Sequence, residues 1–482
     1  MNSPGQLLAR AFSCDLRSLA LFRIALGLLL IADLAWRLPL LASLFSEDGA
    51  WPVEAAIAEV PGSLSLYYLI ASPAWTWSLL AVSALSAIAL IVGWKTRLFT
   101  IVSWVLLISL QQRNTLVLNG GDTMLHLLLF WGMLLPLGAR FSLDSRRTAN
   151  PTAPAHTSVA TAGLLCQVAL IYIFNAIYKT SPSWRVTGEA VAESFRLETY
   201  TTSFAQWLLA WPGLLRIATH GALLLEFLGP FLAFVPWRQG VFRTLTALAF
   251  ISFHATLLLT LRIGLFPIIG IVAWLPFLPA AFWEKFLPSA PLDAPPLRAR
   301  LPVQIFAGIL LTYLITWNVR GYFQRPPSPF RIPAKYLRMP QKWALFAPRP
   351  TLQEGRMVAV IETSEGIGYD AFTGAIVNWK RPQNLGHAIP SAQWRKYLAS
   401  IRDTRRPKRA ILLADWLRRD WERRHPAHTV QRVRLHYLWE STLKRQSPPD
   451  NWLIYENPPG PIGEMARAAG AQPIPPVDRS DN

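Results

Sequence analysis

Residues 19–36 read LALFRIALGLLLIADLAW, and Arg23 and Asp33 are the charged side chains within this run. The run is close to the roughly 20 apolar residues that a helix needs to cross about 30 Å of hydrocarbon. It is too long for the apolar core of a signal peptide, and no small-residue cleavage site follows it. We therefore expect a helix that remains in the membrane.

The composition of the whole chain agrees with a membrane protein. Of the 482 residues, 52% are hydrophobic and 16% are charged, whereas soluble domains carry about 25% charged residues. This balance excludes an ordinary soluble enzyme, a disordered chain and a coiled coil. The sequence predicts a mainly α-helical, polytopic transmembrane bundle of about nine spans. After the first run, the expected spans are 75–94, 98–117, 124–137, 159–178, 214–235, 241–261, 265–282 and 303–317.

The basic residues divide the chain into two parts. Residues 1–319 hold 20 basic and 14 acidic side chains, a net +6, whereas residues 320–482 hold 27 and 14, a net +13. We expect a transmembrane domain at 1–319, a small basic α+β extracytoplasmic domain at 320–450 and a flexible Pro- and Gly-rich tail at 451–482. In the α+β domain, residue patterns predict strands near 357–363, 367–379 and 433–439 and amphipathic helices at 394–401 and 410–421.

Lysine and arginine fall in alternate loops between the runs. The loops between them carry acidic side chains at 47–59 and 189–198. Because Lys and Arg are enriched in cytoplasmic loops, the N-terminus is expected in the cytoplasm and the C-terminal domain outside, in a multi-pass protein of the cell (inner) membrane. The basic loops carry, among others, Arg17, Lys95, Arg140, Arg238 and Lys285.

Charged side chains within or at the end of a run need a partner or a function, because a charge in hydrocarbon is costly. The candidates are Arg23, Asp33, Glu226 and Arg262, which follows the seventh run directly. Arg23 and Asp33 are separated by about 15 Å of helix, so each is expected to find a partner on another helix. A pair between Arg23 and Glu226 is one such arrangement. A structural clamp and a contact with substrate both remain open for these charges.

Asp122, His126 and His254 are candidate binding residues. His126 lies one helical turn after Asp122, so the sequence predicts an Asp–His pair on one helix face. His254 lies inside a run, where an ionisable group is a functional candidate, although a structural hydrogen-bonded histidine is the commoner case. Two cysteines, Cys14 and Cys166, are too few for a disulfide framework. No two histidines have the spacing of a metal pair, so no metal site is expected.

Lys179 is the candidate catalytic residue. It ends the run at 159–178 and precedes the sequence Thr-Ser-Pro-Ser-Trp at 180–184. A lysine at such a place ordinarily extends its ammonium group to the membrane surface. If Lys179 faces the bundle instead, the loss of water favours the neutral amine, which is able to act as a general base.

Five short segments occur in a recognisable order: SLALFRIALGLLLIAD at 18–33, NAIYK at 175–179, FH at 253–254 with GLFP at 264–267, QKWALFAP at 341–348 and WRKY at 394–397. Together they resemble segments of the vitamin K-dependent γ-carboxylases and of their bacterial relatives, the HTTM (horizontally transferred transmembrane domain) proteins. The resemblance covers nearly all of the transmembrane part and some of the C-terminal part.

The resemblance implies a membrane enzyme that oxidises a reduced quinone of the vitamin K or menaquinone type with O2. The base so generated removes a γ-proton from a peptide glutamate, and CO2 then adds. The resemblance further implies that Lys179 deprotonates the reduced quinone and that His254 helps to hold it. The carboxylases carry another histidine near the turn at 119–122, where this chain has none. Asp122 and His126 are the candidates to replace it and to bind substrate or quinone.

Two classes of function follow. A carboxylase-like or quinone-epoxidising enzyme requires an inward-facing Lys179 close to His254. A noncatalytic membrane factor for the maturation, export or immunity of a secreted peptide predicts an exposed Lys179 and an arginine-lined groove. The expected partners are membrane lipid and a secreted or periplasmic peptide. For the arginine clusters at 405–409, 418–419 and 423–424, contact with anionic lipid headgroups is favoured over nucleic acid, because this domain is predicted outside the cytoplasm. A merely solvated helix face is an equally open interpretation.

Overall fold

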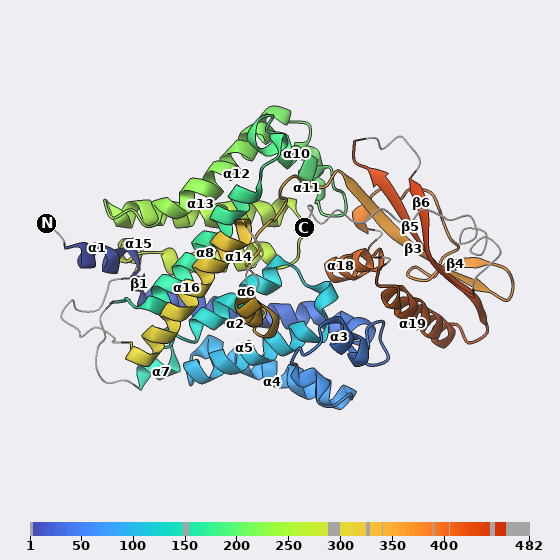
Figure 1. Cartoon of the computed structure of the whole chain (residues 1–482), viewed down its shortest axis with the longest axis horizontal. Coiled ribbons are helices and arrows are strands. Elements are labelled where there is room, and N and C mark those ends of the chain that lie inside the picture. Colours follow the sequence, from blue (N-terminus) through green and yellow to red (C-terminus); the bar gives the residue numbers. More distant parts are fainter. Residues whose placement is uncertain are drawn as a thin grey trace.

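The computed structural model describes residues 3–147, 154–287, 299–323, 328–339, 341–387, 389, 391–403, 405–443 and 449–458. A helical bundle and a smaller α+β domain lie side by side along the long axis of the molecule (Figure 1). The N-terminus lies at the end of the bundle that is remote from the α+β domain (Figure 1). The expected division into a helical front and a mixed C-terminal part therefore corresponds to two spatial units.

Six of the described helices are long and apolar enough to cross a membrane. The first begins at Leu16, where the Asp15 side chain accepts a hydrogen bond from Arg17 N and caps the helix. Its α-helical part is α2 (Leu16–Arg37), and shorter helical turns extend it to Phe45. The spans are Leu16–Phe45, α4 (Pro73–Val92), α8 (Val159–Tyr178), α12 (Pro212–Leu232), α13 (Gln239–Thr260) and α16 (Leu301–Phe323).

The expected count of nine spans is not confirmed. The other three runs also form helices, but each is shorter or more polar than the six. The helix α5 (Thr96–Arg113) ends in Gln111-Gln112-Arg113. The helix α6 (Gly120–Gly132) has 13 residues, because it is capped at Asn119 and ends five residues before the end of the expected run. The helix α14 (Phe266–Trp274) with the 3-10 turn Leu275–Phe277 reaches 12 residues.

One core runs through the bundle and includes buried leucines of α2, α6 and α8, such as Leu26, Leu128 and Leu164. The outer faces of α4, α12, α13 and α16 expose large apolar side chains, as lipid-facing helices do.

Short elements connect the long helices. The connecting elements are α1 (Pro4–Ala11), α3 (Val53–Glu59), η3 (Leu66–Tyr68), η4 (Thr115–Val117), α7 (Leu143–Arg146), α9 (Pro182–Arg185), α10 (Ala190–Phe195), α11 (Ser203–Leu208), α15 (Ala280–Trp283), α17 (Ser328–Tyr336) and the short pair β1 (Cys14–Asp15) and β2 (Ala155–His156).

The C-terminal domain is a four-stranded antiparallel sheet in the order β4-β3-β5-β6. Its strands are β3 (Gln353–Thr363), β4 (Gly368–Asp370), β5 (Val430–Ser441) and β6 (Asp450–Asn457). Apolar residues that alternate along β3 and β5 face the amphipathic helices α18 (Ala392–Ile401) and α19 (Lys408–Arg424), and they share one core. The predicted α+β architecture is thus observed. The flexible tail does not begin at 451, because 450–457 form β6; residues 459–482 lie outside the described part.

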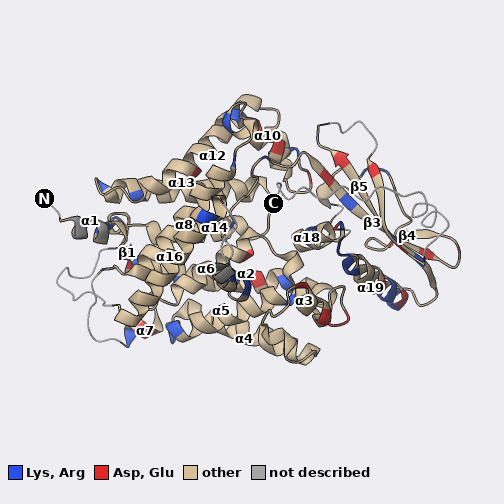
Figure 2. Cartoon of the chain, in the orientation of Figure 1, with Lys and Arg blue, Asp and Glu red and all other residues tan. Residues whose placement is uncertain are grey.

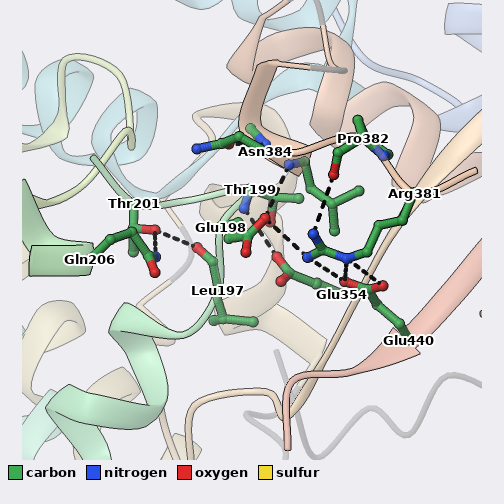
Figure 3. A network of polar contacts seen from close by, with 12 residues as sticks. Leu197, Glu198, Thr199, Thr201, Gln206, Glu354, Arg381, Pro382, Asn384 and Glu440 are labelled. Carbon is green, nitrogen blue, oxygen red and sulfur yellow. Dashed lines mark hydrogen bonds and ion pairs between the residues drawn. The ribbon is translucent and has the colours of Figure 1, made fainter. Parts of the chain in front are cut away.

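Alternate loops of the bundle meet the C-terminal domain. Tyr397 OH on α18 donates to Ala50 O at 2.7 Å, and Arg395 Nη2 donates to Arg262 O at 3.0 Å. Figure 3 shows Arg381 between Glu198 of the bundle, at 3.0 Å, and Glu440 of β5, at 2.8 Å. These contacts place the loops that follow α2, α8 and α13 at the same end of the bundle, as the charge pattern predicts.

Candidate functional site

A buried ion pair joins Lys179, at the C-terminal end of α8, to Glu226 in the middle of α12. The Lys179 Nζ lies 2.5 Å from Glu226 Oε2, and both residues are 3% exposed. Asn175, one turn before Lys179, donates from Nδ2 to Glu226 Oε1 at 3.1 Å. Lys179 therefore faces the bundle and does not extend to the membrane surface. Both oxygens of Glu226 are held by groups on one neighbouring helix.

The segment 341–348, which follows the last long helix, covers this pair. Leu345 N donates to Asn175 Oδ1 at 2.7 Å, so one amide side chain links Glu226 to this segment. The Trp184 ring lies 4.1 Å from Lys179 Nζ, and its indole N–H donates to Phe346 O at 2.9 Å. A cation over an indole face is stabilised most when water is excluded. The segment and Trp184 together separate the ion pair from water.

The arginine that follows this segment is held by a glutamate of the bundle. Arg349 Nε lies 3.1 Å from both carboxylate oxygens of Glu193, and that carboxylate raises the pKa of Arg349. Because Glu193 belongs to α10, this pair fastens the loop that follows Lys179 to the chain that enters β3.

His254 lies on α13 and faces the interior. Its Nε2 is 2.6 Å from Tyr172 OH, and its ring occupies the space left by Gly270, where an added Cβ would lie 2.2 Å from a ring carbon. Among the described residues, no hydrogen-bond partner is found for Nδ1 of this histidine. Phe250 and Trp274 stack on each other with ring centroids 4.0 Å apart, and both pack against Tyr172, the partner of His254. His254 is thus buried among aromatic rings, with a hydrogen-bond partner for one of its two ring nitrogens.

Lys179 and Tyr172, the residue that contacts His254, lie on one side of α8. Tyr172, the partner of His254, precedes Lys179 by seven residues, which is two helical turns on nearly the same face and about 10 Å of rise. Glu226 on α12 completes the same side. Along α8, Lys179 therefore lies about two turns from the tyrosine that contacts His254.

Asp122 belongs to a second buried cluster, which the sequence did not predict. Arg37 donates from Nε and Nη2 to the two carboxylate oxygens of Asp33, each at 2.9 Å, and from Nη2 to Asp122 as well. Asp33 thus pairs with a residue one turn later on its own helix, and the expectation of a partner on another helix is wrong. This cluster joins α2 to the start of α6.

The expected pair between Asp122 and His126 does not form through the carboxylate. His126 Nδ1 lies 3.1 Å from Asp122 O and 3.1 Å from Gln111 Oε1, both of them uncharged oxygens. The carboxylate of Asp122 turns instead to Arg37 and to Asn119 N, at 2.7 Å. A capping position at the start of α6 directs the carboxylate toward the helix end, away from the following turn.

Arg23 does not pair with Glu226. Its guanidinium donates to four main-chain carbonyl oxygens, one at the end of α4, where carbonyls lack partners within the helix, and three in the turn between α6 and α7. Glu226 has Lys179 as its partner. The expectation for Arg23 is therefore wrong, and this side chain acts as a clamp between α2, α4 and the turn after α6. The acceptors are Leu137 O, Arg140 O, Ile91 O and Phe141 O, at 3.1, 3.1, 3.3 and 2.6 Å.

Three residues of the site were not singled out as functional from the sequence: Tyr172, Asn175 and Arg37. Asn175 stands within the recognised segment 175–179, so its position carried a signal. Arg37 follows Asp33 by four residues, a spacing that places two side chains together on a helix. Tyr172 had no local signal, because its partner His254 is 82 residues away. Within the described part of the chain, no group of three His, Cys, Asp or Glu residues has the arrangement of a metal site.

A family model described as "HTTM domain" matches residues 12–283, which is more than half of the chain. The chain belongs to the HTTM-domain family. The matched part contains both buried clusters and every candidate site residue, whereas the C-terminal domain lies beyond it. No curated protein and no solved structure matches the chain. The relation to γ-carboxylases is accordingly an inference at the level of the HTTM family.

Proposed function

We propose that this HTTM-domain protein is a membrane enzyme in which Lys179 acts as a general base toward a reduced quinone. In this proposal the quinone is oxidised by O2, and the reaction supports carboxylation of a peptide glutamate by CO2, as in the γ-carboxylases. One observation carries the proposal: Lys179 is buried at the end of α8 and hydrogen-bonded to Glu226. Surface anchoring does not require such an arrangement.

The quinone is proposed to bind near His254. Tyr172 and His254 supply polar atoms in a buried place, and the stacked rings of Phe250 and Trp274 pack against Tyr172. Ligand sites for apolar molecules have this composition, with few polar groups that fix orientation. A bound reduced quinone would supply an acidic hydroxyl group and two electrons for O2. His254 would donate or accept a hydrogen bond at a quinone oxygen through Nδ1.

The chain's own residues have defined tasks in this scheme. Glu226 is able to take the proton of Lys179, which leaves a neutral amine and a carboxylic acid without an isolated buried charge. Asn175 holds the second oxygen of Glu226 and thereby fixes the direction of the pair. Trp184 and the segment 341–348 exclude water, which would otherwise quench a strong oxygen base.

The noncatalytic alternative makes two structural demands. It needs an exposed Lys179, whereas this lysine is 3% exposed. It also predicts an arginine-lined groove in the C-terminal domain, whereas two arginines of the 405–409 cluster are engaged by the bundle: Arg409 pairs with Glu59 of α3 at 2.8 Å, and Arg406 pairs with the same carboxylate. These contacts favour the enzyme proposal.

The test uses the purified chain in lipid nanodiscs. The chain is supplied with reduced menaquinone or reduced vitamin K, O2, labelled bicarbonate and a glutamate-containing peptide. Quinone epoxide and labelled peptide are measured by mass spectrometry. We expect epoxide from the wild type and a loss of at least about 100-fold in Lys179→Arg, the range associated with removal of a general base. Arginine retains a positive charge for Glu226 but does not lose its proton in proteins.

Lys95→Arg is the matched control, because Lys95 is exposed at the opposite end of the bundle. This control should form epoxide at the wild-type rate. Equal traces from the wild type and Lys179→Arg would refute the role of Lys179 as the base. Epoxide without labelled peptide would support the quinone step and refute carboxylation of the peptide supplied.

A further inference from the structure

The short helix α11 and the turn after it carry three exposed aromatic rings in a row. Phe204 and Trp207 stack with ring centroids 5.8 Å apart, and Trp207 and Trp211 follow at 6.2 Å. Trp207 is 58% exposed and Trp211 is 55% exposed. These three residues form the aromatic row. A contiguous exposed apolar patch marks a surface that contacts another molecule or a membrane.

The other side of α11 is fixed to the bundle. Ala205 is fully buried and shares a small core with Leu215 of α12 and Leu261. Gln206 Nε2 donates to Phe195 O at 2.6 Å. The helix is therefore amphipathic, and its inner side holds the aromatic row in a defined position on the outside of the bundle.

The aromatic row stands at the height where two long helices end. Thr202, directly before α11, donates from its main-chain N to the O of Thr260, the last residue of α13, at 3.0 Å. Trp211 directly precedes Pro212, the first residue of α12. Both α12 and α13 are long and apolar enough to span a membrane. The helix α11 lies at the end of the bundle that faces the C-terminal domain (Figure 1). This height corresponds to the boundary between hydrocarbon and water.

Exposed apolar side chains continue from the aromatic row into α12. Leu214 and Ile217 are 52% and 72% exposed, and Leu224 further along the helix is also exposed. Arg216, one turn inside α12, is exposed as well. A long cationic side chain at this depth reaches the lipid phosphates while its stem stays among apolar groups. Indole rings are enriched at the same boundary, because they are amphipathic. The lipid-facing surface of α12 and the aromatic row thus form one continuous interface.

We propose that α11 and the first turns of α12 anchor the chain in the phospholipid leaflet on the side of the C-terminal domain. The aromatic row inserts at the boundary between headgroups and acyl chains, and Arg216 extends to the phosphates. The loop directly before α11 carries Glu198, which pairs with Arg381 of the C-terminal domain. Lipid contact at α11 therefore steadies a surface on which this domain docks. The anchor does not depend on catalysis, so its test is independent of the quinone proposal.

A nitroxide label at position 207 tests the anchor. The full chain with Trp207→Cys is labelled in nanodiscs of phosphatidylcholine and phosphatidylglycerol. Spin relaxation by O2, which dissolves in hydrocarbon, is compared with relaxation by a water-soluble nickel chelate. Trp379→Cys is the matched control, because Trp379 is an exposed tryptophan of the C-terminal domain. The unsubstituted chain gives the background signal from Cys14 and Cys166.

We expect the ratio of the O2 effect to the nickel effect to be at least about threefold higher at position 207 than at position 379, as for a group about 5–10 Å below the headgroup level. Equal ratios at the two positions would overturn the anchor, because the label would then lie in water. Low accessibility to both reagents would indicate a protein contact, such as a second copy of the chain, and would overturn it as well.

Hydrogen exchange tests the link to the docking loop. The double variant Trp207→Ser with Trp211→Ser should speed exchange at 195–202 in nanodiscs by at least about twofold, because the loop loses its support from lipid. Trp237→Ser is the control, since Trp237 is 64% exposed at the other end of the bundle, between α12 and α13. It should leave exchange at 195–202 unchanged. Wild-type exchange in the double variant would refute the stabilisation of this loop by lipid.

Discussion

Replacement of Lys179 by methionine should destabilise the bundle strongly, because it leaves Glu226 without its counter-charge. Glu226 is 3% exposed, and after the change Asn175 alone holds its carboxylate. Removal of one partner of a buried ion pair costs about 3–5 kcal/mol. The contact of Lys179 with the Trp184 ring adds to the loss, since methionine carries no charge. We expect the free energy of unfolding to fall by about 4 kcal/mol.

The double variant Lys179→Met with Glu226→Leu should be more stable than Lys179→Met alone. It removes both charges and replaces them with apolar side chains of similar length. Replacement of a whole buried ion pair by well-packed apolar residues is often neutral or stabilising. Glu226→Leu alone should be destabilised by less than Lys179→Met if Lys179 loses its proton, because a neutral amine needs no counter-charge.

Reversible unfolding in mixed micelles, followed by tryptophan fluorescence, measures these free energies. Lys95→Met is the control, because Lys95 is exposed; it should change stability by less than about 0.5 kcal/mol. A Lys179→Met variant within about 1 kcal/mol of the wild type would show that the pair is not buried as described. A double variant less stable than both single variants would refute the argument from uncompensated charge.

Three more perturbations test other parts of the molecule. Arg381→Met should weaken docking of the C-terminal domain and should speed hydrogen exchange at 195–202. The expected loss of docking free energy is about 1–3 kcal/mol, a value reduced for solvent screening because the Arg381 side chain is a quarter exposed. Burial lowers the pKa of His436, so the neutral ring is favoured in the fold, and sheet stability should fall as pH drops below about 6.5 in thermal unfolding. His436→Gln should lack this fall. Gly270→Ala should displace the His254 ring, lower stability by about 1–3 kcal/mol and abolish quinone binding measured by fluorescence quenching.

Much of the architecture followed from the sequence because it depends on local periodicity. The runs at 159–178 and 241–261 became α8 and α13 within one or two residues. The helices at 394–401 and 410–421 and the alternating strand at 433–439 were also confirmed. The strand β6 was missed, although Trp-Leu-Ile-Tyr at 452–455 is rich in strand-forming residues. The Pro-rich residues that follow it drew the prediction toward an irregular tail.

The partners of buried charges could be predicted only in part. Asp33 and Arg37 stand four residues apart, so their contact was available from the sequence, but the first apolar run ends at Trp36 and leaves Arg37 out. Lys179 and Glu226 are 47 residues apart on different helices, and no local pattern reports which helices are neighbours. Arg23 binds carbonyl groups, which every residue carries, so its partners leave no trace in the side-chain sequence.

Basic side chains of the C-terminal domain help to dock this domain on the bundle, in addition to the contact with lipid headgroups expected from the sequence. In Figure 2, Lys and Arg positions of this domain, coloured blue on α19, lie close to acidic positions, coloured red, around α3. Glu59 of α3 receives Arg406 and Arg409, and Glu198 receives Arg381. The acidic loops that oppose the basic ones along the chain are thus the surfaces on which this domain docks.

Docking fixes which loops share an end of the bundle, because the domain touches the loops that follow α2, α8 and α13 together. It does not choose between the two sides of the membrane, since an inverted bundle would carry the domain with it. The side is still predicted by the Lys and Arg bias of the opposite loops alone. The same contacts hold the loop after Lys179 through Glu193 and Glu198. A change in the C-terminal domain should therefore reach the Lys179 pair through this loop, without direct contact with it.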